Sequence, residues 1–217
     1  MRQSNVSFPC GELMLEGKCY YPDDEGTYPA VILCHPHPLY GGSMHNNVVQ
    51  ALSLTLVNQS IIAFMFNFRG AGRSEGSFGG GIAEQEDVSA AINWLTSQSE
   101  VDPGKIGLAG YSFGAAVASQ VACNDERIKA MALISPPLET SQISRLKDCP
   151  KPKLIISGTD DFVVSTQKAE LIDRESAEPK QFELVAGADH FWQGHEHAMA
   201  ETVTAFFSTF FRTFYSR

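Results

Sequence analysis

The segment Gly110-Tyr-Ser-Phe-Gly114 directly follows an apolar run, Ile106-Gly-Leu-Ala109, and opens a small, apolar helical pattern over residues 113–122. A serine on so sharp a strand-to-helix turn has a strained backbone, and only glycine or another small residue fits two positions to either side. The turn also places Ser112 at the N-terminal end of the helix, where backbone N–H groups point toward a developing anion. The segment therefore predicts a strand, a nucleophilic serine and a helix, in that order.

On both sides of this turn, short apolar runs alternate with longer helical patterns, which is typical of an α/β protein with a mostly parallel sheet. Loose alternation over residues 6–21 predicts an antiparallel hairpin at the sheet edge. Further strands are predicted at residues 30–34, 61–66, 106–109, 130–134, 153–157 and 181–185. Helices are predicted at residues 46–58, 82–96, 113–122 and 197–215.

The last predicted helix has a continuous aromatic stripe. Core packing is the favoured interpretation, and an interface in a homodimer is the alternative. Contact with a membrane surface is disfavoured, because the opposite face is not rich in Lys and Arg. The stripe consists of Val203, Phe206, Phe207, Phe210, Phe211 and Phe214, which share one helix face.

No low-complexity linker interrupts the chain, so residues 1–217 are predicted to form a single domain.

Charge and composition exclude two classes of partner. The formal net charge is −9, and no cluster of Lys and Arg is present that could bind phosphates, so no nucleic-acid partner is expected. The longest apolar run, residues 61–66, is too short to span a bilayer, so no membrane partner is expected either.

The cysteines and the N-terminus indicate a cytoplasmic protein. The five cysteines are an odd number and none forms a C-x-x-C pair, which favours free thiols in a reducing compartment. The first 17 residues contain no apolar stretch of signal-peptide length.

A nucleophilic serine requires a general base, and the base requires an acid that orients it. After Ser112 the chain offers Gly158-Thr-Asp-Asp161 and Gly187-Ala-Asp-His190, each directly behind a predicted strand. The carboxyl ends of parallel strands meet at one edge of an open sheet, where functional sites form. Ser112, Asp161 and His190 are therefore the predicted catalytic residues, with Asp160 as the alternative acid.

Backbone N–H groups are also needed to stabilise the oxyanion of an acyl-transfer intermediate. One is expected from Phe113, the residue after the serine. The other is expected from the loop Cys34-His-Pro-His-Pro-Leu-Tyr-Gly-Gly42, whose prolines have no N–H. The candidates in this loop are His37, Leu39 and Tyr40, and the position in the loop favours His37.

Five segments in chain order carry a family resemblance: His35-Pro-His-Pro-Leu-Tyr-Gly-Gly-Ser-Met-His-Asn46, Asn67-Phe-Arg-Gly-Ala-Gly-Arg-Ser74, Gly110-Tyr-Ser-Phe-Gly114, Gly158-Thr-Asp-Asp161 and Gly187-Ala-Asp-His-Phe191. Together they resemble the small bacterial α/β hydrolases related to dienelactone hydrolases and short carboxylesterases, over nearly the whole chain. The resemblance implies an α/β-hydrolase fold with a mostly parallel sheet of roughly eight strands and helices on both faces. It also implies hydrolysis of a small ester or thioester, with Ser112, Asp161 and His190 as the triad.

One position departs from the dienelactone hydrolases proper, which use a cysteine as nucleophile where this chain has Ser112. This difference argues against lactone chemistry. The connection over residues 136–152 is short and polar, so we expect an open site with little or no lid and a preference for short acyl groups. The residues expected to bind substrate are Leu39, Tyr40, Phe162 and Phe191, although each could instead be a packing residue.

Two alternatives to an esterase remain at this level. The same triad could serve a serine peptidase or a cofactor-free perhydrolase, and the fold could belong to a non-catalytic binding protein. No cofactor is predicted, because the glycine-rich segment 70–76 has the wrong spacing for a dinucleotide loop. No metal site is predicted either, because no histidine pair matches a known ligand spacing.

Overall fold

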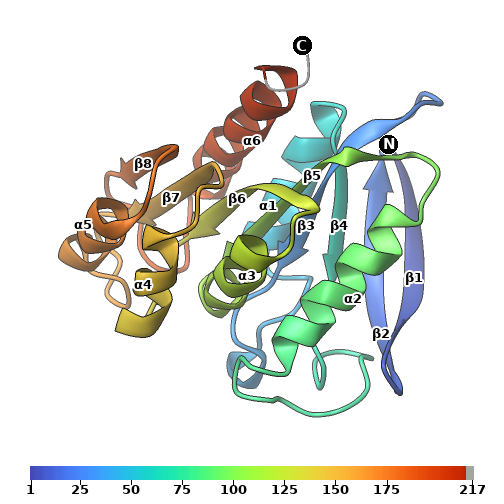
Figure 1. Ribbon diagram of the computed structural model, residues 1–217, viewed down its shortest axis with the longest axis horizontal. Coiled ribbons are helices and arrows are strands. Elements are labelled where there is room, and N and C mark those ends of the chain that lie inside the picture. The colour runs from blue at the N-terminus through green and yellow to red at the C-terminus, as the bar shows by residue number, and fades with distance from the viewer. Residues whose placement is uncertain (214–217) are drawn as a thin grey trace.

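The computed structural model describes residues 1–213, whose strands form one eight-stranded sheet in the order β1-β2-β4-β3-β5-β6-β7-β8 (Figure 1). The strands are β1 (Arg2–Cys10), β2 (Leu13–Tyr21), β3 (Tyr28–Cys34), β4 (Ile62–Phe66), β5 (Val101–Tyr111), β6 (Ile128–Ile134), β7 (Lys153–Gly158) and β8 (Lys180–Val185). The helices are η1 (Pro38–Tyr40), α1 (Asn47–Asn58), α2 (Glu84–Thr96), α3 (Phe113–Asn124), α4 (Thr140–Lys147), α5 (Thr166–Glu175) and α6 (Glu196–Thr213).

Strand direction follows the sequence prediction. β1 and β2 form an antiparallel hairpin at one edge, and β2 also pairs antiparallel with β4. All pairs from β4 through β3, β5, β6 and β7 to β8 are parallel. The mostly parallel α/β sheet is thus confirmed. β8 is the other edge strand, and its side chains are only partly buried or exposed.

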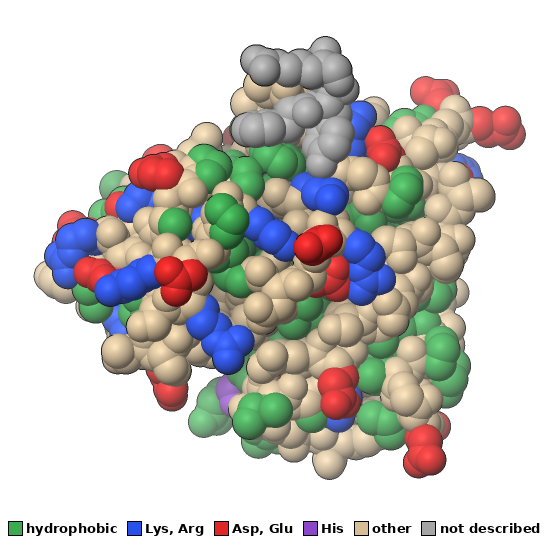
Figure 2. All heavy atoms as spheres, viewed as in Figure 1, with side chains coloured by type: hydrophobic (Ala, Val, Ile, Leu, Met, Phe, Trp, Pro, Cys, Tyr) green, Lys and Arg blue, Asp and Glu red, His purple; other side chains and the backbone are tan. Residues whose placement is uncertain are grey.

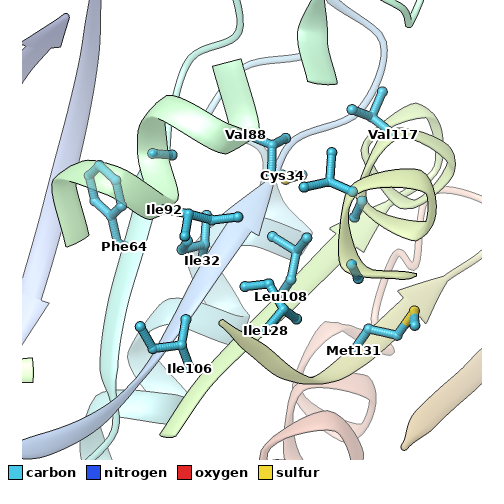
Figure 3. Close-up of a cluster of buried hydrophobic side chains, with 14 of the residues drawn as sticks. Ile32, Cys34, Phe64, Val88, Ile92, Ile106, Leu108, Val117, Ile128 and Met131 are labelled. Atoms are coloured by element: carbon cyan, nitrogen blue, oxygen red, sulfur yellow. The ribbon is translucent and has the colours of Figure 1, made fainter. Parts of the chain in front are cut away.

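Helices cover both faces of the sheet and bury two apolar clusters. On one face, side chains of α2 and α3 such as Val88 and Val117 pack on Ile32 and Leu108 of the central strands (Figure 3). α1 and α6 cover the opposite face, and Figure 1 shows them behind the sheet with α2 and α3 in front. The central strands are therefore buried on both faces, which explains why they appear in the sequence as unbroken apolar runs.

Core packing is the observed role of the aromatic stripe on α6. Val203, Phe206, Phe207, Phe210 and Phe211 are all buried in the cluster beneath that helix. β5 accommodates the helix closely, since a side chain at Gly107 would collide with the Phe207 ring. Phe214 and the predicted last turn through residue 215 lie outside the described residues.

Two α-helices were not predicted, α4 and α5. Each buries only two apolar side chains, Ile143 and Leu146 on α4 and Ala169 and Ile172 on α5. Such sparse apolar positions give little helical periodicity in the sequence. The short, polar connection between β6 and β7 thus contains a helix, α4.

The surface shows no single dominant charge on the face in view. Figure 2 shows Lys and Arg side chains interspersed with Asp and Glu where α4 and α5 lie in Figure 1. Within residues 1–213, no helix is long and apolar enough to cross a membrane.

Candidate active site

Ser112 occupies a strained turn between β5 and α3. Its backbone angles are φ 52° and ψ −121°, a conformation that residues other than glycine rarely adopt. The flanking glycines are required by close backbone approach. A side chain at Gly110 would collide with the backbone at Gly114, and one at Gly114 would collide with the carbonyl oxygens of Cys34 and His35. The turn is thus held tightly against the end of β3.

The turn should tolerate no side chain at position 114. Gly114→Ala is expected to lower the free energy of unfolding by about 3 kcal/mol or more, because the colliding atoms are backbone and cannot rotate away. Gly11→Ala is the matched control, since Gly11 has φ 59° but nothing within contact range of an added methyl group. It should cost only about 1 kcal/mol. Urea unfolding of both variants checks this, and equal losses would contradict the steric explanation.

The structure brings the three predicted catalytic side chains together. Ser112 Oγ lies 3.0 Å from His190 Nε2. His190 Nδ1 lies 2.9 Å and 3.0 Å from the two carboxylate oxygens of Asp161. Asp160, the alternative acid, is exposed and accepts a hydrogen bond from the hydroxyl of Thr159. The geometry therefore distinguishes the two neighbouring aspartates and leaves Asp161 as the partner of the histidine.

The Asp161 carboxylate is buried and held in its charged form. Its Oδ1 accepts hydrogen bonds from the N–H groups of Val163 and Val164, at 2.9 Å and 2.7 Å. Burial alone would raise the pKa of this carboxyl, but hydrogen bonds from His190, the Val164 N–H and Ser135 outweigh it, and the pKa lies below its usual value. An ionised Asp161 can thus orient the imidazole and stabilise its protonated form.

Three further residues surround His190 and Asp161, and sequence reasoning did not single them out. The Tyr111 hydroxyl donates to the backbone oxygen of His190 at 2.6 Å. Trp192 donates from Nε1 to Ser135 Oγ at 3.1 Å, and Ser135 is among the groups that lower the pKa of Asp161. Ser135 and Trp192 both have positive φ, 44° and 61°. The available signal was position alone, because Ser135 directly follows β6 at the edge of the sheet where the other site residues gather.

The loop after β3 brings a candidate oxyanion donor to the same place. The candidate donors in this loop were the N–H groups of His37, Leu39 and Tyr40. Two of them have partners within the loop, since the Leu39 N–H donates to His37 Nδ1 at 3.2 Å and the Tyr40 N–H donates to the His37 carbonyl at 3.1 Å. The His37 ring lies 4.9 Å from the Phe113 ring, centroid to centroid. As the first residue of α3, Phe113 has an N–H without a partner inside the helix. These contacts favour the pair Phe113 and His37 over the other candidates.

His35, the first histidine of the same loop, is structural. Its ring is fully buried, Nδ1 lies 2.6 Å from the Pro36 oxygen, and Nε2 accepts the Phe68 N–H at 3.0 Å. One nitrogen therefore donates and the other accepts, which only the neutral imidazole can do. Burial lowers the pKa of His35 to about 4.

His35 should make the protein sensitive to mild acid. An unfolded histidine binds a proton near pH 6.5, whereas His35 in the folded chain resists protonation until about pH 4. Its contribution is therefore complete above about pH 6.5 and falls as the pH drops toward 4, by roughly 3 kcal/mol in all. Unfolding titrations should show a steeper pH dependence for the wild type than for His35→Gln. The exposed His197→Gln variant should follow the wild type, and identical slopes for all three would contradict the assignment.

Two buried carboxylates fix the loops that surround the site. Glu16 accepts hydrogen bonds from Asn67 and Arg73, and Asn67 Oδ1 accepts the Met44 N–H at 2.7 Å, which joins β2 to two loops. Glu84 accepts the N–H groups of Gly79 and Gly81, both at 2.7 Å. Glu84 therefore fixes the loop around Gly79 and Gly81, directly before α2.

A cavity of about 930 Å³ opens over Ser112 and His190. Of the residues predicted to bind substrate, Tyr40 and Phe191 line it, as does Phe113. Leu39 and Phe162 do not line it, and their side chains are 67% and 70% exposed. The connection between β6 and β7 borders the cavity through residues such as Ser141 and Gln142, without covering it by a large insertion.

Comparisons with known proteins match nearly the whole chain. The model of the X-Pro dipeptidyl-peptidase family (S15 family) matches residues 12–207. An uncharacterized protein of Rickettsia prowazekii is 31% identical, over 94% of this chain and 88% of its own. An α/β serine hydrolase homologue from Coxiella burnetii is 30% identical with a TM-score of 0.86, over 94% of this chain and 97% of its own. A serine hydrolase without a lid from Xanthomonas campestris is 27% identical with a TM-score of 0.81, over 95% of this chain and 94% of its own.

Proposed function

We propose that this chain, which belongs to the X-Pro dipeptidyl-peptidase (S15) family and has the α/β-hydrolase fold of serine hydrolases, cleaves a small carboxylic ester or thioester. The reaction would pass through an acyl-enzyme on Ser112. The observation that carries the proposal is the chain of contacts from Ser112 Oγ to His190 and on to Asp161.

In the proposed mechanism, His190 Nε2 accepts the proton of Ser112 as Oγ attacks the acyl carbonyl carbon. The N–H groups of Phe113 and His37 stabilise the resulting oxyanion, and one such donor contributes roughly 3–4 kcal/mol to catalysis. His190 then protonates the leaving alcohol or thiol, and the C–O or C–S bond breaks. A water molecule, deprotonated by the same imidazole, attacks the acyl-enzyme and releases the acid.

The cavity supports an ester over a dipeptide. A dipeptidyl-peptidase must hold the free ammonium group of its substrate, which requires a carboxylate near the nucleophile. Among the described residues that line the cavity, Glu139 alone has a carboxylate side chain, and it forms the capping box of α4 with Gln142. The other walls near Ser112 are mainly apolar, for example Phe113, Ala116 and Val117.

The family match makes peptidase activity the second candidate, so the test includes both. A fluorophosphonate probe should label Ser112, which peptide mapping by mass spectrometry would locate. The same preparation is assayed on p-nitrophenyl esters of increasing acyl length, on acyl-CoA thioesters and on X-Pro p-nitroanilides. Turnover of short esters or thioesters with little cleavage of the anilides is expected. Labelling with cleavage of the anilides alone would establish the peptidase, and absence of labelling would favour a binding protein.

A further inference from the structure

The α3 helix forms one wall of the cavity along two turns. Ser112 stands at its N-terminus, and Ala116, Val117 and Gln120 follow on the same wall. A rise of 1.5 Å per residue places Gln120 roughly 12 Å along the helix from the serine. The wall is therefore small and apolar next to the nucleophile and carries an amide at its far end.

Gln120 is a buried polar side chain with a free acceptor. It is only 6% exposed, and its Nε2 donates to Ser119 Oγ at 3.1 Å. None of the hydrogen bonds within residues 1–213 uses its Oε1. Among the described residues, the fully enclosed polar side-chain atoms without a hydrogen-bond partner are the hydroxyl oxygens of Ser157, Thr204 and Ser208, so Gln120 Oε1 is not fully enclosed. Because Gln120 lines the cavity, this oxygen is accessible from the open space of the cavity.

A second cavity of about 810 Å³ adjoins the first at this point. Gln85 and Gln120 line both cavities, so the two amides stand between them. Gln85 is itself oriented by donation from Nε2 to the Gly81 oxygen at 3.1 Å. Beyond the amides the walls become polar, with side chains such as Asn93 and Asn124.

The second cavity is polar, and two of its three acidic side chains are paired, while the third, Glu126, is exposed to solvent. Asp125 is bridged to Arg127 at 2.6 Å, and Glu86 is bridged to Arg69 at 3.1 Å. Paired carboxylates offer little net charge to a ligand. The amides and the paired carboxylates next to Gln120 therefore make this end of the site suited to hydrogen-bonding groups such as hydroxyls.

The chemistry at Ser112 determines which part of the substrate points toward Gln120. The leaving group must lie at His190 Nε2, which protonates it, and the carbonyl oxygen must lie at the N–H groups of Phe113 and His37. The remaining substituent of the reacting carbon is the acyl chain. It can extend along the face of α3, away from His190 and toward Gln120.

We propose that Gln120 Oε1 accepts a hydrogen bond from a hydroxyl group at the distal end of the acyl chain, so that the substrate is an ester or thioester of a hydroxylated acid. The inference rests on the proposed function and specifies its substrate class. An unsubstituted alkyl chain would cover the buried amide oxygen without satisfying it, whereas a distal hydroxyl would supply the missing donor. Sites built around such a group discriminate against analogues that lack it.

The test compares matched pairs of p-nitrophenyl esters, each an alkanoate and its ω-hydroxy counterpart, from hexanoic to decanoic acid, chains that are long enough to approach Gln120 and too long to close readily to a lactone. The wild type should favour the hydroxylated member by roughly tenfold in kcat/KM at one or more chain lengths. In Gln120→Leu that ratio should fall to about one or below, because the acceptor is gone. The ratio is taken within each variant, so a general change in folding or catalysis cancels.

Gln167→Leu provides the control, since Gln167 is exposed on α5 and lines neither cavity, and it should keep the wild-type ratio. Gln120→Met, which nearly preserves side-chain volume, repeats the test if the leucine variant is poorly folded. A wild-type ratio of one at every chain length, or an unchanged ratio in both Gln120 variants, would overturn the proposal while leaving ester hydrolysis intact. Failure of the wild type on every ester would instead remove the proposed function, and this inference with it.

Discussion

Ser112→Ala is expected to lower kcat for ester hydrolysis by roughly 10⁴- to 10⁶-fold, because no other group can form the acyl-enzyme. Ser112 Oγ is in contact with the imidazole that would activate it, and its backbone strain is retained only where the surrounding structure enforces it. The measurement is steady-state turnover of a short p-nitrophenyl ester, together with loss of covalent labelling by the fluorophosphonate probe.

Ser208→Ala provides the control for this replacement. The Ser208 hydroxyl is buried on α6 without a hydrogen-bond partner among the described residues, so its removal should alter neither turnover nor labelling. Retention of more than a few per cent of wild-type turnover in Ser112→Ala would show that the chemistry occurs elsewhere.

The second large effect is expected at the acid. Asp161→Asn should lower kcat roughly 10³- to 10⁴-fold at neutral pH, although the side chain keeps its shape. The N–H groups of Val163 and Val164 both donate to Oδ1, so they would hold the amide oxygen of the asparagine in that position. Its NH₂ would then face His190 Nδ1 and donate to it, which places the imidazole proton on Nε2. A protonated Nε2 of the neutral ring cannot accept the Ser112 proton.

Asp160→Asn tests the same substitution one residue earlier. Asp160 is exposed and has no contact with His190, so this variant should retain nearly full activity. Both variants are compared by kcat and by urea unfolding, which separates loss of catalysis from loss of folding. Equal impairment at both positions would mean that the loop, rather than the Asp161 carboxylate, is what matters.

The parts of the fold that follow from strong local constraints were predictable from the sequence. Central strands such as β4 and β6 are buried on both faces, so they appear as unbroken apolar runs. The turn at Ser112 needs glycine at positions 110 and 114 because backbone atoms fill the space where side chains would lie. Asp161 and His190 could be proposed as partners of Ser112 because each lies in the loop after a parallel strand, β7 or β8, and these strands end at the same sheet edge.

Other features depend on contacts between distant segments, and these leave little trace in the sequence. α4 and α5 bury too few side chains to produce a periodic signal. The hydrogen bond from Tyr111 to the His190 backbone links positions 79 residues apart, and no local pattern records it. Gln120 lies in a helix of otherwise ordinary composition, and only the two cavities on either side of its amide distinguish it.

His190, the proposed general base, lies on the loop that leaves β8, the strand with a single hydrogen-bonded neighbour and incompletely buried side chains. Strands of this kind detach locally at a lower free energy than the centre of a sheet. Warming should therefore separate the imidazole from the serine before the central strands come apart. Thermal inactivation would then set in below the melting temperature, and an enzyme that has lost its turnover would regain it on cooling, because most of its core had never opened.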